Sequence, residues 1–353
     1  MKKLVIVVML LCAAVLVFAN GGGEKASDFT YGKEVAYPGA VPVKKQASFD
    51  SLAYTEGKVP VVAYMPPATE FNYYMAIGAG IEALAADMGV DYFLLAPQSG
   101  GDINGQMGML QDVITQGVDV IILSTHDEFA AAPLVEQAVN QGIEVIIVNS
   151  DIADFPTPIH GVVGYSQRNG TYKIGEYLLD KLNGKTVQVG LIEGQPGYHS
   201  TERIGGFVDA VESASNVEIV YSVDGKWNVE GGNIAAMDML QAHPEVDVIF
   251  AANDYEIMGA QRAAESLGMD VMLLGNDGDT ACLEEIAAGN VDATVNTTPF
   301  EMGRIALQVA LDGIEGNFSG GFVETPTVIV DKENAVEYLS DPDKLFPKPS
   351  KSY

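Results

Sequence analysis

The chain has 353 residues, with 48 acidic and 19 basic side chains and a formal net charge of −29. This length predicts one large or two medium domains with ample buried core. So strong a negative charge repels phosphate backbones, which argues against nucleic acid as a partner and fits solubility in an extracytoplasmic space.

The N-terminus has the features of a secretory signal peptide. Two lysines precede an apolar run (residues 4–18), and Val17 and Ala19 occupy the −3 and −1 positions of a small-residue cleavage site. We therefore expect residues 1–19 to be a signal peptide that is cleaved near Ala19. The run is about 15 residues long, short of the roughly 20 that span a bilayer, which disfavours an uncleaved membrane anchor.

The segment that follows predicts a tether. Residues 20–57 lack a sustained hydrophobic period and contain much Gly, Lys, Ser and Pro, so some of them could pack on the body while the rest link it to the leader. Leu11 stands before Cys12, where a lipoprotein signal requires a small residue. Cys282 is then the only cysteine of the mature chain, so no intrachain disulfide is expected.

From Val59 onward, short apolar segments alternate with longer amphipathic ones. The apolar segments are rich in β-branched residues, as strands buried on both faces of a parallel sheet are. The amphipathic segments, such as residues 107–117, 132–142, 172–182 and 258–268, have helical spacing and several end on glycine. Nine strands are predicted, at residues 59–65, 91–96, 119–124, 144–149, 187–193, 217–223, 247–252, 271–276 and 292–297.

Strands that alternate with helices in this way indicate an α/β fold. Nine are too many for one small sheet, which leaves a (β/α)₈ barrel or two open, doubly wound parallel sheets. We expect two sheets, the second beginning near Tyr165. Open parallel sheets bind ligands at the carboxyl ends of their strands, so the residues there are the candidates for a binding site.

Asn, Asp, Arg and Thr recur just after the predicted strands. Aspartate accepts from neighbouring hydroxyls and arginine donates to ring or hydroxyl oxygens, so this set suits a polyhydroxylated ligand. Asp254 and either Asp279 or Thr280 precede helices and are interpreted as N-caps. Asn253 and Asp277 each lie before such a cap and are stronger ligand candidates. The polar residues after the strands are Asn149-Ser150-Asp151, Arg203, Asn253-Asp254, Asn276-Asp277-Gly278-Asp279 and Thr297-Thr298.

The aromatic residues add a second signal. Trp227, the only tryptophan, lies in the polar loop "DGKWNVEGG" and not in a periodic core segment. A loop tryptophan suits stacking on a sugar face, although it could also fill an interdomain crevice. Phe71, Tyr73 and Tyr74 follow the first strand, where one or two of them should face a crevice.

Neither catalysis nor cofactor binding is indicated. The four histidines lack metal-ligand spacing, and no nucleophile elbow or P-loop is present, so no metal, cofactor or catalytic residue is expected. Residues 78–83 fit the G-x-G-x-x-A dinucleotide fingerprint, but such glycines must lie directly after the first strand. Here they come about thirteen residues later, inside a predicted helix, where small residues allow close packing on the sheet.

Several segments together resemble a known family. From about Val59 to Val330, the chain is similar to the ribose-binding-protein-like substrate-binding proteins of ABC transporters, which have the type I periplasmic-binding-protein fold also found in LacI-type repressor cores. The segments that carry the resemblance are "FNYYMAIGAGIEALAADMGV", "QGVDVIILSTHD", "QGIEVIIVNSD", "STERIGGFVDAV", "DMLQAHPEVDVIFAANDYEIMGAQRAAESLG", "LLGNDGD" and "ATVNTTP".

The resemblance implies two Rossmann-like lobes joined by a three-crossing hinge, which close on a sugar. Residues 58–164 plus 298–325 would form the N-terminal lobe, and residues 165–297 plus 326–353 the C-terminal lobe. By position in the family's motifs, the implied ligand-binding residues are Phe71, Asn149, Asp151, Gln167, Arg203, Trp227, Asn253, Asp277 and Thr297. Where ribose binders carry Asp-Arg after the fourth strand, this chain has Asn149-Ser150 followed by Asp151, which disfavours ribose itself.

The resemblance also implies a function. We expect a periplasmic, monomeric receptor that binds a sugar or polyol and delivers it to the membrane permease of an ABC transporter, without chemistry on the ligand. The alternative is a sensor that docks to a chemoreceptor or histidine kinase. A secreted enzyme is disfavoured by the missing catalytic set, and a repressor by the signal peptide and the acidity.

Overall fold

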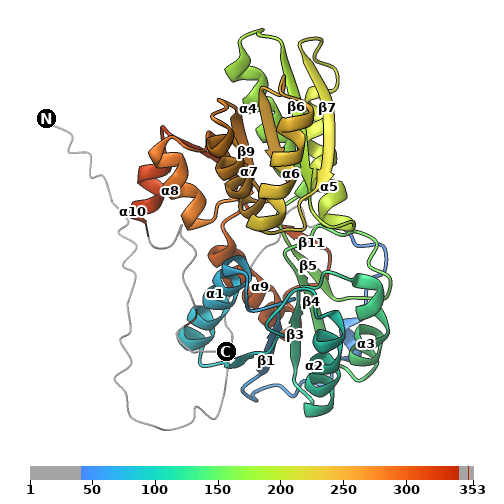
Figure 1. The fold of residues 1–353 in the computed structure, drawn as a ribbon. Helices are drawn as coiled ribbons and strands as arrows, with labels where there is room; N and C mark the ends of the chain where they lie inside the picture. Colours follow the sequence, from blue (N-terminus) through green and yellow to red (C-terminus); the bar gives the residue numbers. More distant parts are fainter. Residues whose placement is uncertain (1–40, 342–348, 350–353) are drawn as a thin grey trace, which may run out of the picture.

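The computed structural model describes residues 41–341 and Pro349. The predicted signal peptide and residues 20–40 of the predicted tether therefore lie outside the described residues. Within residues 41–341, two six-stranded sheets are each covered by helices and form two lobes (Figure 1). The prediction of two doubly wound sheets is confirmed, and neither sheet closes into a barrel. No helix in this part of the chain is both long and apolar enough to cross a bilayer.

The first lobe is built on a sheet with strand order β11-β5-β4-β3-β1-β2, in which every neighbouring pair is parallel. Helices α1 and α9 cover one face of this sheet and α2 and α3 the other. Its elements are β1 Val61–Met65, α1 Asn72–Met88, β2 Asp91–Leu94, α2 Ile103–Gln116, β3 Val120–Leu123, α3 Glu128–Asn140, β4 Glu144–Val148, β5 Gly161–Gly164, α9 Pro299–Ile314 and β11 Phe322–Glu324.

The second lobe repeats this plan with strand order β12-β10-β9-β8-β6-β7, in which only β12 runs antiparallel to its neighbour. Helices α4 and α5 cover one face, and α6, α7 and α8 the other. Its elements are α4 Gln167–Leu182, β6 Val187–Glu193, α5 Tyr198–Val211, β7 Val217–Asp224, α6 Val229–Ala242, β8 Val248–Ala251, α7 Asp254–Leu267, β9 Met272–Asp277, α8 Thr280–Ala288, β10 Ala293–Asn296, β12 Val328–Asp331 and α10 Ala335–Ser340.

The central strands are apolar throughout because both faces of each sheet are buried. In β4, Ile146 packs with α1 and α9, whereas its neighbours Val145 and Ile147 pack with α2 and α3. Successive side chains of a strand point to opposite faces, so a doubly covered strand needs an unbroken apolar run. All nine predicted strands are present, including the edge strands β2 and β7, which are only partly buried.

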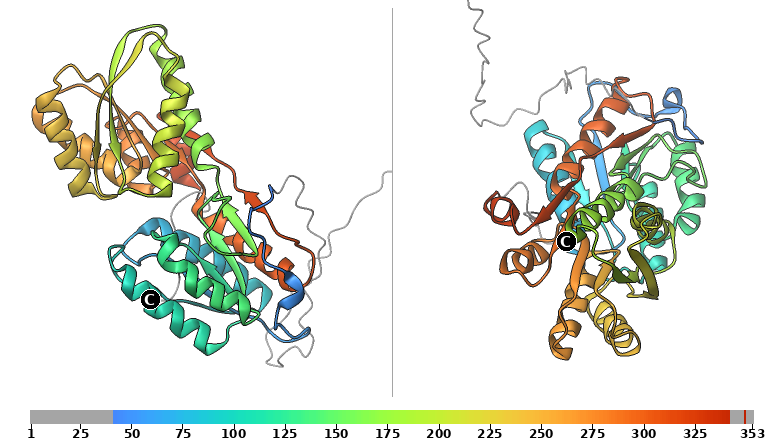
Figure 2. Two further views of the ribbon diagram at one scale, coloured as in Figure 1. Left: turned by 90° about the vertical axis from the view of Figure 1, so that its right-hand side faces the viewer. Right: turned by 90° about the horizontal axis from the view of Figure 1, so that it is seen from above.

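The chain crosses between the lobes three times, as the resemblance implied. The crossings follow β5, follow β10, and connect β11 to β12. The left view of Figure 2 shows the two lobes and the segments that join them. In both sheets, the carboxyl ends of the parallel strands lead to the space between the lobes, where the functional site is expected.

The glycines of the apparent dinucleotide fingerprint lie inside α1, as predicted. A β-carbon at Gly78 would meet the side chains of Tyr64 and Leu94, which belong to the sheet. A β-carbon at Gly80 would instead overlap the backbone of Phe300 in α9. These glycines therefore let α1 approach both the sheet and α9, and they form no phosphate-binding turn.

The described part of the predicted tether, residues 41–57, packs against the first lobe. Val41 forms a bridge with Phe322 of β11, and Gln46 forms another with Ile159 just before β5. The Gln46 amide donates to the carbonyls of Ile159 and His160 and accepts from the amide of Gly321. This segment therefore covers the outer edge of the first sheet.

Candidate functional site

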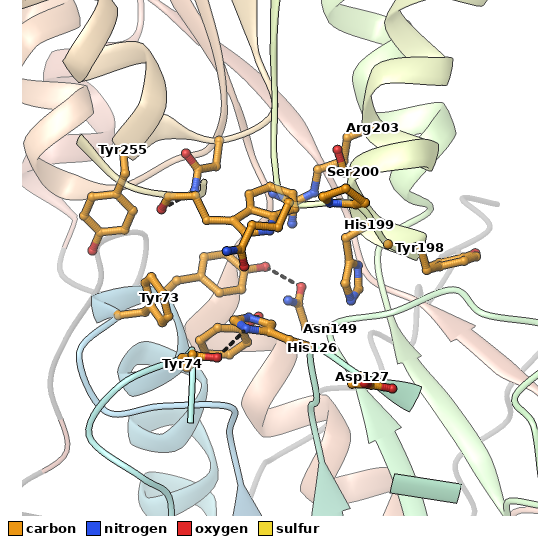
Figure 3. Close-up of a pocket in the computed structure, with 18 of the residues that line it drawn as sticks. Tyr73, Tyr74, His126, Asp127, Asn149, Tyr198, His199, Ser200, Arg203 and Tyr255 are labelled. Atoms are coloured by element: carbon orange, nitrogen blue, oxygen red, sulfur yellow. Dashed lines mark hydrogen bonds between the residues drawn. The ribbon is translucent and has the colours of Figure 1, made fainter. Parts of the chain in front are cut away.

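A cavity of about 330 Å³ lies between the two lobes. This volume is within the usual range for the pockets of small ligands. Residues of both lobes line it: in Figure 3, Tyr73, Tyr74, His126 and Asn149 come from the first lobe, and Tyr198, His199, Arg203 and Tyr255 from the second. We call this cavity the main pocket.

Six of the nine sequence-predicted residues line the main pocket. They are Phe71 and Asn149 from the first lobe and Arg203, Trp227, Asn253 and Asp277 from the second. The structure does not bring the other three, Asp151, Gln167 and Thr297, to the pocket wall.

These three residues lie just behind the wall, and each holds a residue that lines it. The Gln167 side-chain oxygen accepts from Arg203 Nε at 2.7 Å. The Thr297 hydroxyl lies 2.9 Å from the Tyr73 hydroxyl. Asp151 accepts from the Tyr198 hydroxyl at 2.9 Å and from the amide of Gln167 at 3.0 Å. Their contacts fix the lining residues across the hinge.

Arg203 and Asp277 form a buried ion pair at the base of the pocket. Arg203 Nη1 lies 3.0 Å from Asp277 Oδ1 and also donates to the carbonyl of Ala252. Burial raises the pKa of Asp277 to about 6, because it outweighs the opposing effect of the arginine. Burial alone would lower the pKa of Arg203, but Tyr165 and Asp277 raise it, so the arginine stays charged.

The first turn of α7 organises the second-lobe side of the pocket. The sequence predicted Asp254 as the N-cap, but this is wrong: Asn253 is the cap, and its side-chain oxygen accepts from the amide of Glu256. Asp254 is fully buried and accepts from the amides of Gly278 and Asp279. It therefore fixes the turn that follows Asp277. The predicted cap at Asp279 is confirmed for α8.

Trp227 is held by its backbone rather than by its side chain. Its amide donates to the Glu256 carboxylate at 2.7 Å, and its carbonyl accepts from the Asn253 amide at 3.2 Å. A β-carbon at Gly194 would overlap the indole ring, so the ring lies directly against this glycine. The guanidinium carbon of Arg203 is 5.5 Å from the ring centroid.

The first-lobe wall is aromatic. Phe71 lies edge-on to both Tyr74 and His126, with ring centroids 5.9 Å apart in each pair. The Tyr73 hydroxyl donates to the Asn149 side chain at 2.9 Å. Such a wall offers apolar ring faces with hydroxyl and amide groups between them, which suits a ligand that is itself part apolar and part hydroxylated.

Two histidines that the sequence analysis considered only as metal ligands line the main pocket. His126 follows β3, at the kind of strand end where the other candidates were sought, and its ring lies within 3.3 Å of both the Gly100 carbonyl and the Tyr74 hydroxyl. His199 begins α5 beside Tyr198. Burial lowers the pKa of His126, and burial together with Arg203 lowers the pKa of His199 to about 3. Both are therefore neutral near pH 7.

Backbone strain is concentrated at this site. Asn149, Trp227, Asp277 and Thr298 all have positive φ angles, of 60°, 63°, 138° and 49°. Side chains other than glycine adopt this region only at a cost, and such residues cluster at functional sites. Three of the four line the main pocket, so the strained backbone serves to present their side chains.

The arrangement is suited to binding and not to bond breaking. Its one cation and its buried carboxylate already pair with each other, and among the described residues no cluster of His, Cys, Asp and Glu has the geometry of a metal site. The wall supplies ring faces, amides, hydroxyls and one ion pair at fixed positions. Such a set recognises an uncharged, hydroxylated molecule by hydrogen bonds and stacking.

Comparison with known families gives a match over most of the body. Residues 62–317 match the family described as "Periplasmic binding protein domain".

Curated relatives show the same likeness. The D-ribose/D-allose-binding protein of Pseudomonas aeruginosa is 31% identical over 242 residues, which cover 65% of this chain and 75% of the relative. The ribose import binding protein of Bacillus subtilis is 29% identical over 245 residues, which cover 69% and 78%.

Solved structures agree in fold. The ABC transporter periplasmic solute-binding protein of Actinobacillus succinogenes, with bound D-allose, has a TM-score of 0.75 and 26% identity, with 79% of this chain and 100% of that chain covered. The myo-inositol-binding protein of Caulobacter, bound to myo-inositol, has a TM-score of 0.73 and 26% identity, with 81% and 97% covered.

Proposed function

The chain belongs to the periplasmic binding protein domain family, and from this membership we propose that its main pocket captures a sugar or a related polyol for an ABC permease. The observation that carries the proposal is the pocket itself. It lies between two lobes that are joined by three crossings of the chain. Its wall combines aromatic faces with the Arg203–Asp277 ion pair. The relatives named for ribose, allose and myo-inositol support the same ligand class.

Import is favoured over the alternatives. The relatives are named as import binding proteins or transporter solute-binding proteins, which supports delivery to a permease over a purely sensory role. The family consists of binding proteins, so the chain is not an enzyme. No chemistry on the ligand is required, because affinity arises from contacts that form when the lobes close around it.

Location and organisation follow from the same membership. The family is periplasmic, and we propose that the mature protein begins near Asn20 after cleavage at Ala19 and acts as a monomer. We further propose that residues 58–164 with 298–325, and residues 165–297 with 326–353, move as the two rigid units. The positions of the two sheets and of the three crossings support these limits within residues 41–341, whereas residues 342–348 and 350–353 of the second unit lie outside the described residues.

A ligand panel tests the proposal. The mature protein is heated with D-ribose, D-allose, D-glucose, D-galactose, D-xylose, L-arabinose or myo-inositol, and its melting temperature is recorded. A ligand at about 100 times its dissociation constant should add about 2.7 kcal/mol to the free energy of unfolding. A panel in which no sugar or polyol raises the melting temperature would contradict the proposal.

Trp227 provides an independent readout of the same site. Because it is the only tryptophan, a ligand that stacks on it should change the fluorescence of the protein saturably. We expect Trp227→Ala to weaken binding by about 1.5 kcal/mol or more, since a stacked aromatic face is lost. Calorimetric titration of this variant checks the result, and an unchanged affinity would remove Trp227 from the ligand contacts.

A further inference from the structure

A second, smaller cavity adjoins the main pocket. It has a volume of about 20 Å³ and shares Glu128, Tyr198 and His199 with the main pocket as walls. We call it the side pocket. A cavity needs roughly 10–15 Å³ to admit one water molecule, so the side pocket has room for a group of one or two heavy atoms.

The side pocket is lined by both apolar and polar residues. Ile147, Val148, Ile152 and Phe155 supply apolar surface from the first lobe. Ser124, which follows β3 directly, is a polar member of the lining together with Thr125, Ser150 and His199. A group that contains both a carbon and a polar atom therefore suits this lining.

Two polar atoms of its wall are buried without a hydrogen bond of standard geometry among the described residues, although the Tyr74 hydroxyl, whose pKa is raised by burial, lies close enough to Ser124 for this contact to lower that pKa. They are Ser124 Oγ, on a residue that is only 1% exposed, and the buried His199 Nδ1. Other polar side chains of the wall are occupied: Thr125 Oγ1 donates to Gln106 at 3.0 Å, Ser150 Oγ accepts from the amide of Ile152 at 3.2 Å, and the Tyr198 hydroxyl donates to Asp151. Native proteins seldom leave buried polar atoms unpaired, so these two indicate a missing partner.

We propose that the side pocket receives the exocyclic hydroxymethyl group of a sugar ring held in the main pocket, which makes a hexose the preferred ligand class over a pentose. This inference rests on the proposed function. The methylene packs against Ile147 and Ile152, which belong to the same core, and the hydroxyl bonds with Ser124 Oγ and His199 Nδ1. A hydroxyl is both donor and acceptor, so it can satisfy these two atoms together.

The charge of the surroundings supports an uncharged arm. His199 is neutral because burial and Arg203 lower its pKa to about 3, so it offers no counter-charge to a carboxylate. Glu128 lies in the same wall and would repel one. A charged arm would enter a buried space without a partner, which is unfavourable.

The test compares sugars that differ only in this arm. D-Allose, D-glucose and D-galactose are the hydroxymethyl-bearing counterparts of D-ribose, D-xylose and L-arabinose, and 6-deoxy-D-glucose and D-fucose lack only the terminal hydroxyl. Dissociation constants are measured by calorimetric titration of the mature protein. We expect at least one hexose to bind about tenfold or more tightly than its pentose, with its 6-deoxy analogue, where one is tested, in between.

Variants of Ser124 connect this preference to the side pocket. Ser124→Val fills the space and should abolish the difference between hexose and pentose. Ser124→Ala keeps the space but removes the hydroxyl, so it should weaken hexose binding and leave the hexose level with its 6-deoxy analogue. Ser51→Val, at an exposed serine of the short helix Phe49–Ser51, is the matched control and should change neither affinity. Melting temperatures without ligand confirm that each variant folds.

The outcomes separate this inference from the proposed function. Pentose and hexose affinities within about threefold of each other, or a 6-deoxy sugar as tight as its hexose, would show that the side pocket holds only a water molecule. An unchanged hexose preference in Ser124→Val would likewise overturn the assignment. If none of these sugars or myo-inositol binds the unaltered protein, the proposed function itself fails, and the inference fails with it.

Discussion

At the scale of single residues, Asp277 makes ligand binding depend on pH. Burial raises its pKa to about 6, above the usual value of 3.8. Sugar hydroxyls donate more strongly to an ionised carboxylate, which accepts on both oxygens, than to a protonated carboxyl, so binding favours the ionised form. Lowering the pH through 6 protonates Asp277 in the free protein, and ligand binding must then displace that proton.

We therefore expect the dissociation constant to rise about tenfold between pH 7 and pH 5, measured by calorimetric titration with the most stabilising sugar of the panel. The neighbouring histidines are neutral at pH 7, because burial and Arg203 lower the pKa of His199 to about 3 and burial lowers that of His126. Asp277→Asn should bind more weakly throughout and with a flat profile. A slope that persists in this variant would assign the pH dependence to another group.

At the scale of elements, the first turn of α7 does more for the site than any other segment. Asn253 caps the helix, and Asp254 fixes the turn after Asp277. Tyr255 reaches the first lobe, and Glu256 holds the backbone of Trp227. We expect Asp254→Ala to lower the free energy of unfolding by about 2–4 kcal/mol, since two buried amides lose their acceptor.

The same variant should weaken sugar binding although Asp254 does not line the main pocket. Chemical denaturation measures the first effect and calorimetric titration the second. Asp238→Ala, at an exposed position of α6 in the same lobe, is the control and should change stability by less than about 0.5 kcal/mol. Equal affinities of Asp254→Ala and the unaltered protein would show that the turn after Asp277 keeps its geometry without this carboxylate.

At the scale of the whole molecule, two tyrosines of the second lobe join the lobes across the cleft. The Tyr198 hydroxyl donates to Asp151, and the Tyr255 hydroxyl accepts from the amide of Asn72 at 3.3 Å. These contacts lie at the main pocket and need no ligand. They stabilise the arrangement in which the two sets of side chains face each other.

We expect Tyr198→Phe to shift the ligand-free protein towards a more open shape, because a hydrogen bond to a carboxylate contributes about 1.5–3 kcal/mol. Small-angle scattering should show a larger radius of gyration without sugar and a normal one with it. Asp151→Asn tests the same contact from a residue that does not line the pocket. If both variants keep the original radius of gyration, the contact does not control closure.

The sequence alone predicts the two sheets well because their central strands are buried on both faces and so read as unbroken apolar runs. It misses β5, β11 and β12, since β5 has only four residues bounded by glycines and the other two are short edge strands with mixed burial.

The candidate site is predicted in part. The rule that polar residues at strand ends bind ligands identifies Asn149 and Asp277. The same rule would have identified His126, but the histidines were tested only for metal-ligand spacing. Gln167 and Thr297 could not be distinguished from lining residues, because their depth depends on how the hinge segments pack. Ser150 stands where ribose binders carry an arginine. The importance of this short side chain is seen only in three dimensions, where Ser150 lies in the wall of the side pocket.

The three crossings between the lobes also have a consequence for the order in which the protein can fold. The first sheet receives its last strand, β11, and its covering helix α9 only after the whole second lobe except β12 and α10 has been synthesised. β12 then completes the second sheet from Val328–Asp331. Neither lobe can therefore reach its final packing until nearly all of the body has left the ribosome, and long-range pairings of this kind slow folding. Slow closure of this kind suits a chain that is exported before it folds, which is the route that the predicted signal peptide implies.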